Sequence, residues 1–172
     1  MVFFTADEHY YHANIISNSF RDKRHFNTVD EMNRTIIKRH NEVVAKEDIT
    51  YHLGDFTFSK HWQDMRQILD RLNGRHILIL GNHDLFKPFD YVEVGFESVH
   101  TSLEIIAPFG VSSTPLLIHD PAVAGVLTNK LVVHGHTHAL GVQLAPNTYC
   151  VSVELHDYYP VPICDIRFKG EV

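Results

Sequence analysis

The sequence predicts an α/β fold in which two mixed sheets lie face to face with helices outside. Two observations support this prediction. The first half alternates short apolar runs with longer amphipathic stretches, and the second half is richer in strand-like runs separated by Gly and Pro. No repeat or linker interrupts the 172 residues, so we expect a single domain over residues 1–172.

Five short apolar runs are each followed within a few residues by Asp, His or Asn. They are Val2–Thr5, Ile49–Leu53, Ile77–Leu80, Leu116–Ile118 and Leu131–Val133. Runs of this kind predict buried strands. Because open α/β sheets bind ligands at the carboxyl ends of their strands, we expect the polar residues that follow these runs to meet at one edge.

Two helices are expected between the first three strands. Thr28 and Glu31 have the spacing of a capping box, and the helix that follows is expected to end near Lys46. Ser59 is the expected N-cap of the second helix, whose apolar stripe, Trp62–Leu72, should lie in the core. Successive strand–helix–strand units imply parallel strands with right-handed crossovers.

The later part of the chain predicts a sheet that is partly antiparallel. Its further strand-like runs are Leu103–Ala107, Tyr149–Val153 and Val161–Phe168. The stretch Val92–His100 is ambiguous between helix and strand.

The composition argues against some classes of protein. A net charge of −6 argues against strong nonspecific binding to nucleic acid. No apolar stretch is long enough to span a bilayer and no signal peptide is recognisable, which favours a cytoplasmic protein. Cys150 and Cys164 are expected to be buried thiols rather than a disulfide.

Histidine is unusually frequent, with 14 residues scattered along the chain. Histidine is the commonest metal ligand and a proton carrier at neutral pH. His52 and His134 are expected to be structural. Those without a partner in a motif are expected at the surface or as capping groups: His25, His40, His61, His76, His100 and His156.

The residues after the predicted strands supply seven oxygen or nitrogen donors. They are Asp7, His9, Asp55, Asn82, His119, His136 and His138. Seven donors suffice for two metal ions if a carboxylate bridges them, and Asp55 lies in the middle of the ligand order. Mixed carboxylate and imidazole donors suit Mn first, with Fe, Zn or Ni as alternatives.

Two divalent ions roughly 3.5–4 Å apart can clamp phosphoryl oxygens and generate a bridging hydroxide at neutral pH. Such a pair outweighs the charges of Asp7 and Asp55, so the site would attract an anion. An acidic chain can therefore bind a small phosphorylated substrate, and a nucleotide is compatible with this chemistry.

The ordered motifs resemble the calcineurin-like metallophosphoesterase family. They are Asp7-Glu8-His9, Gly54-Asp55, Gly81-Asn82-His83-Asp84, His119 and Gly135-His136-Thr137-His138. In that family the residue before the lone His is usually Gly, and here it is Ile118. The stretches His12–Asn14, Val151–Glu154 and Tyr158–Pro160 are similar to a small phage and bacterial branch of the family.

The resemblance implies a four-layer α/β/β/α sandwich and a role for each motif residue. The first metal would be held by Asp7, His9, Asp55 and His138. The second would be held by Asp55, Asn82, His119 and His136. His83 would be the general acid, Asp84 would orient it, and Asn82 would help to stabilise developing charge.

The expected function is therefore a dinuclear-metal-dependent phosphoesterase that hydrolyses phosphodiesters, with phosphomonoesters as further substrates. The alternative is a catalytically weak protein of the same fold that acts as a protein-binding scaffold. A third hypothesis is another metallohydrolase that uses His134, His136 and His138 directly. Tyr10, Tyr11 and His12 could stack on a base or simply pack in a loop, and Arg24 could contact phosphate or be solvated.

Overall fold

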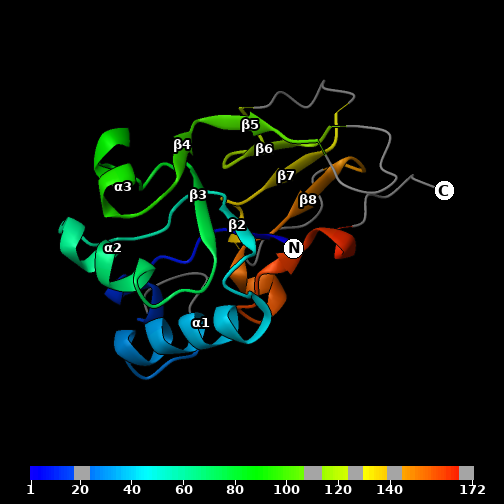
Figure 1. Ribbon diagram of the computed structural model, residues 1–172. Coiled ribbons are helices and arrows are strands. Elements are labelled where there is room, and N and C mark those ends of the chain that lie inside the picture. The colour runs from blue at the N-terminus through cyan, green and yellow to red at the C-terminus, as the bar shows by residue number, and fades with distance from the viewer. Residues whose placement is uncertain (18–23, 107–113, 124–129, 139–144, 167–172) are drawn as a thin grey trace.

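The computed structural model describes residues 1–17, 24–106, 114–123, 130–138 and 145–166. It contains a five-stranded sheet with the order β4-β3-β2-β1-β9 and a four-stranded sheet with the order β5-β6-β7-β8. Figure 1 shows the three α-helices gathered on one side of the five-stranded sheet and the four-stranded sheet at upper right. The predicted α/β fold of two mixed sheets with helices outside is confirmed.

Both sheets are mostly parallel, and each has one antiparallel edge strand. The strands of the first sheet are β1 (Val2–Thr5), β2 (Ile49–His52), β3 (Arg75–Ile79), β4 (Ser98–His100) and β9 (Val161–Pro162), of which β9 is antiparallel to β1. The strands of the second are β5 (Ser102–Glu104), β6 (Leu116–Ile118), β7 (Val132–His134) and β8 (Thr148–Cys150), of which β5 is antiparallel to β6.

The first α-helix begins as predicted. α1 (Val29–Val43) starts after Thr28, whose hydroxyl accepts the backbone N–H of Glu31 at 3.0 Å. The helix ends at Val43, three residues before Lys46, the predicted end.

The other helices depart further from the prediction. α2 (Trp62–Leu69) has His61 rather than Ser59 as its N-cap. The ambiguous stretch after residue 91 divides at Gly95 between α3 (Pro88–Val94) and β4. Short 3₁₀ helices occupy Ala13–Ile16, Val153–His156 and Ile163–Asp165.

Two apolar layers hold the fold together, one on each face of the five-stranded sheet. Leu78 of β3 joins the core under the helices, with Met32 of α1 and Ile68 of α2. The next residue, Ile79, points to the opposite face and packs with Leu117 of β6 between the sheets. Because side chains alternate along a strand, burial on both faces explains why the parallel strands are apolar at successive positions.

Some burial predictions were wrong. Trp62, expected in the core, is 50% exposed at the start of α2. Cys150 is buried but Cys164 is exposed, and both are free thiols. Within the part of the chain that the structure describes, no helix combines the length and apolar character that crossing a bilayer requires. The cytoplasmic location stays a prediction.

His40 and His76 were expected near the surface, but both are buried beneath the five-stranded sheet with His52. His52 Nδ1 lies 2.5 Å from Glu8 Oε1, and His52 Nε2 lies 3.0 Å from His76 Nδ1. His40 Nε2 donates to the Asn73 carbonyl at 2.8 Å. The prediction failed because isolated histidines carry no periodic signal, whereas tertiary packing brings strand and helix positions together.

Burial gives one of these histidines a measurable effect on stability. Burial lowers the pKa of His40 from 6.5 to about 4, so the unfolded chain takes up a proton before the folded one as the pH falls below 6.5. Replacing His40 by Gln keeps an N–H donor and removes this titration. Between pH 7.5 and pH 5 we expect the wild type to lose about 2 kcal/mol of unfolding free energy relative to His40→Gln.

Urea unfolding at the two pH values measures this difference. His25→Gln is the matched control because His25 is exposed, and it should follow the wild type. Parallel pH dependence of the wild type and His40→Gln would contradict the assignment.

Candidate metal centre

The ends of the parallel strands are aligned at one edge of the molecule. In the first sheet Thr5 of β1 pairs with His52 of β2, and His52 pairs with Leu78 of β3. In the second sheet Ile118 of β6 pairs with His134 of β7. Within each sheet, the loops after these strands therefore start at the same level. The seven predicted donors lie on these loops, and the described contacts link all seven through short distances.

Asp55 stands between the two groups of predicted ligands. Its Oδ2 atom lies 3.5 Å from His9 Nε2 and also 3.5 Å from His119 Nε2. Its Oδ1 atom accepts the backbone N–H of His83 at 2.8 Å. One carboxylate oxygen is therefore equally close to a histidine of each predicted ligand set.

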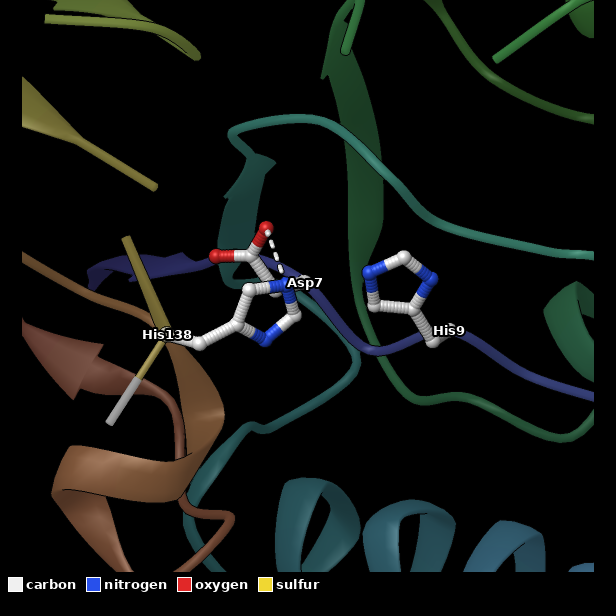
Figure 2. A group of neighbouring side chains, drawn as sticks. All are labelled: Asp7, His9 and His138. Carbon is white, nitrogen blue, oxygen red and sulfur yellow. Dashed lines mark ion pairs between the residues drawn. The ribbon is translucent and has the colours of Figure 1, made fainter. Parts of the chain in front are cut away.

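The first group consists of Asp7, His9 and His138, whose ligand atoms lie within 4.8 Å of one another. Figure 2 shows these side chains, with a dashed line between Asp7 and His138 and the His9 ring beside them. His138 Nε2 lies 3.9 Å from Asp7 Oδ1, and the His9 and His138 rings are 5.1 Å apart.

The second group gathers Asn82, His119 and His136 around one amide oxygen. Asn82 Oδ1 lies 3.1 Å from His119 Nε2 and 2.9 Å from His136 Nδ1. The two ring nitrogens are 3.2 Å apart. Asp7, Asp55 and His119 also form a compact triad, so the two groups are continuous through the carboxylates. Ile118 in place of the usual Gly leaves His119 at the site.

Two of the histidines are oriented by acceptors behind them. His119 Nδ1 donates to the Leu53 carbonyl at 2.8 Å, which leaves Nε2 facing Asp55. His138 Nδ1 lies 2.9 Å from Glu154 Oε1, which leaves Nε2 facing Asp7. Such partners fix the tautomer and the ring orientation of metal-binding histidines.

In the part of the chain that the structure describes, one buried ligand of this site, His9, lacks the hydrogen-bond partners that protein groups usually provide. His9 is buried, and among the described residues neither of its ring nitrogens has a hydrogen-bond partner. Burial lowers the pKa of His9, so the ring is neutral and offers a lone pair. Burial also raises the pKa of Asp7 to about 6. A cation among these donors would satisfy both groups, so the residues fit a divalent metal ion.

The backbone at the site is held in an unusual conformation. Five of the seven predicted ligands have a positive φ: Asp7 (58°), His9 (50°), Asp55 (57°), His136 (69°) and His138 (47°). Side-chain-bearing residues in the left-handed region cost free energy and cluster at functional sites. The strand ends thus turn sharply, and the ligand side chains contact one another beyond the ends of the strands.

Two motif glycines are required by close approach. A Cβ atom on Gly81 would overlap the Asp55 carboxylate, and one on Gly54 would overlap the His119 ring. Gly54 also has a φ of 90°, which favours glycine. The glycines before Asp55 and Asn82 therefore make room for the ligand side chains.

The three predicted catalytic residues are differently placed. Asn82 and His83 are exposed, and the His83 ring lies 5.6 Å from the His9 ring. Asp84 is buried and accepts the backbone N–H groups of Asp55, Phe56 and Gly81. Its described contacts therefore hold the loop that carries Asp55, and not the His83 ring as predicted.

Sequence reasoning singled out Arg24 but missed its buried position, and it missed the role of Glu154. Arg24 is fully buried, so the expectation of a solvated side chain was wrong. Its guanidinium donates to Glu154 at 2.6 Å and to the backbone carbonyls of Asp7 and Glu8. Burial alone would raise the pKa of Glu154, but Arg24 and His138 outweigh it and lower that pKa to about 2. For Glu154 the signal was the likeness of Val151–Glu154 to the phage and bacterial branch.

The remaining predicted candidates lie outside the cluster. His134 is buried in β7 and belongs to neither compact ligand group, so the described residues do not assemble the His134, His136 and His138 string into one site. Tyr10 is buried in the core under the helices, which excludes it as a base-stacking wall. His12 stacks on Phe58 beside the site.

The chain resembles several proteins over most of its length, although no family model matches it. The solved structure of the protein of unknown function AQ665 from Aquifex aeolicus has 28% identity, covers 94% of both chains and superposes with a TM-score of 0.68. Gene 66 protein of Mycobacterium phage L5 is 32% identical over 79% of this chain and 76% of its own length. Uncharacterized protein MJ1445 of Methanocaldococcus jannaschii is 34% identical over 99% of this chain and 93% of its own length. The chain belongs to the same family as this archaeal protein.

Proposed function

We propose that this chain is a dinuclear-metal-dependent phosphoesterase of the calcineurin-like type that hydrolyses phosphodiesters. The observation that carries the proposal is the position of Asp55 Oδ2, which is 3.5 Å from a histidine of each ligand set. One set comprises Asp7, His9, Asp55 and His138, and the other comprises Asp55, Asn82, His119 and His136. Manganese is the proposed metal, because hard carboxylate and borderline imidazole donors are mixed.

Two divalent cations, when bound, supply Lewis-acid activation of the phosphoryl group and of water. The protein's contribution is to place the donors and the proton source. His83 is exposed beside His9 and next to Asp55, so its ring can reach the leaving oxygen of a bound ester and donate a proton. The amide nitrogen of Asn82 can donate a hydrogen bond to a phosphoryl oxygen.

The Asp55 assignment predicts a loss of metal binding. Asp55→Asn removes the charge shared by both ligand sets while keeping the side-chain size. After chelation, we expect the wild type to bind two Mn(II) ions by calorimetric titration and to recover hydrolysis of bis(p-nitrophenyl) phosphate. Asp55→Asn should bind them at least about tenfold more weakly. Asp70→Asn, which changes an exposed carboxylate at the C-cap of α2, is the control, and equal affinities in both variants would refute the shared role.

The general-acid assignment predicts an effect that depends on the leaving group. His83→Asn should lower kcat for alkyl esters by about 100-fold or more, because a poor leaving group needs the proton. Esters of p-nitrophenol should be much less affected, since their leaving group departs without protonation. His61→Asn is the matched control, because His61 is exposed at the start of α2. An equal loss with both ester classes would remove His83 from this role.

The contacts of Glu154 with Arg24 and His138 predict that Glu154 positions the His138 ring for metal binding. Glu154→Gln keeps an acceptor oxygen but loses the charge that orients the His138 ring, and we expect Mn(II) affinity to fall about 10- to 100-fold. The folded state, followed by circular dichroism, should persist. Glu97→Gln tests an exposed ion pair with Arg75 and should bind metal like the wild type. Unchanged affinity in Glu154→Gln would show that His138 needs no such partner.

A further inference from the structure

A pocket of about 280 Å³ adjoins His83, and none of the second ligand group lines it. Its lining residues are Phe58, Ser59, Lys60, His83, Leu85 and Phe86. Another pocket of about 270 Å³ lies across the Asn82 loop and is lined by His119, Asp120 and His136 among others. The two pockets differ in chemistry, since the first is walled by phenylalanine and leucine and the second includes proposed metal ligands and a carboxylate.

The wall of the first pocket includes the apolar side chains of Phe58, Leu85 and Phe86. The Phe58 ring stacks on His12 with a centroid distance of 3.8 Å and an interplanar angle of 4°. It also lies 5.0 Å from the His83 ring and 6.0 Å from the His9 ring. Phe58 nevertheless remains 40% exposed, and Leu85 is 84% exposed. Large apolar side chains exposed around a hollow beside polar groups are typical of a small-molecule site.

We propose that this pocket is a nucleoside subsite, which holds the leaving group of the phosphodiester. The inference rests on the proposed function, because a group attached to the oxygen that His83 protonates must lie beside His83. In the reaction a water molecule loses one proton as its oxygen bonds to phosphorus, and the bond from phosphorus to the ribose O5′ breaks with its electron pair left on O5′. The O5′ atom takes the proton of His83, the proton lost by the water restores the protonated His83 ring, and the nucleoside leaves from the pocket.

The chemistry of the pocket favours a nucleoside over other apolar groups. A flat heteroaromatic base can pack against the exposed part of the Phe58 ring, and such stacking contributes to binding whatever the base. Lys60 is exposed and lines the pocket, so its ammonium group can donate to ribose or base oxygens. The volume of about 280 Å³ is just below the roughly 300–1,000 Å³ range of pockets for drug-sized ligands, which suits one nucleoside. The net charge of −6 disfavours a long nucleic acid.

The first test measures binding without metal, because the pocket consists of protein side chains alone. Adenosine is titrated into the metal-free protein and followed by NMR, with ribose as the comparison ligand. We expect adenosine to bind and ribose not to bind. Phe58→Ala should weaken adenosine binding about fivefold or more, as expected for the loss of a stacking partner. Leu85→Ala, at an exposed position that cannot disturb the core, should weaken it as well.

Phe89→Ala is the matched control, because Phe89 is an exposed phenylalanine on α3 that does not line the pocket. It should bind adenosine like the wild type. The subsite is overturned if adenosine does not bind, or if the Phe58 and Leu85 variants bind it as tightly as the Phe89 variant does.

The second test identifies the bond that breaks. The methyl ester of adenosine 5′-monophosphate carries two alkyl leaving groups, so the intrinsic chemistry favours neither strongly. With Mn(II), the wild type should release mainly adenosine and methyl phosphate, and Phe58→Ala should lower the share of adenosine. Release of methanol and adenosine 5′-monophosphate as main products would overturn the leaving-group placement. If the wild type hydrolyses no ester at all, the proposed function fails, while adenosine binding still decides the subsite.

Discussion

The rest of the structure depends on the hydrogen bonds that the buried carboxylate of Asp7 accepts from the second sheet. Asp7 follows β1 in the five-stranded sheet and accepts the backbone N–H of His136, which follows β7 in the four-stranded sheet, at 3.0 Å. It also accepts the hydroxyl of Ser152, beyond β8. One side chain thereby joins the carboxyl ends of both sheets. Burying a carboxylate costs free energy unless a positive charge lies nearby. The residue that connects the two sheets would therefore be stabilised by a bound cation.

The geometry of the strand ends explains how the side chains that could bind a cation come together. Parallel register brings the ends of β1, β2 and β3 to one level, and left-handed backbone at Asp7, His9 and Asp55 turns their side chains toward the second sheet. Asp84 and Arg24 then hold these loops through backbone N–H and carbonyl groups. The strained backbone at the ligands depends on these hydrogen bonds, because a strained conformation persists only where the surrounding structure holds it.

Much of the fold was predictable because its signals are local or periodic. The strand β6 was predicted with its observed bounds, and the cap at Thr28 was found from its spacing to Glu31. The predictions of the end of α1 and of the N-cap of α2 were less accurate, because several neighbouring residues can end or cap a helix almost equally well. Arg24, His40 and His76 were misplaced for a different reason: no pattern in the neighbouring sequence reports that a polar side chain will be enclosed by distant elements.

The sequence by itself determined the α/β class, the apolar strands and the set of seven donors that follow them, because strand periodicity and residue chemistry are local properties. Only the tertiary structure decided that Asp55 lies between two histidines of different loops and that Arg24 and Glu154 stand behind His138. It also decided that Phe58 and His83 line the same pocket. These relations join residues distant in the chain, and they depend on how two sheets pack rather than on any segment alone.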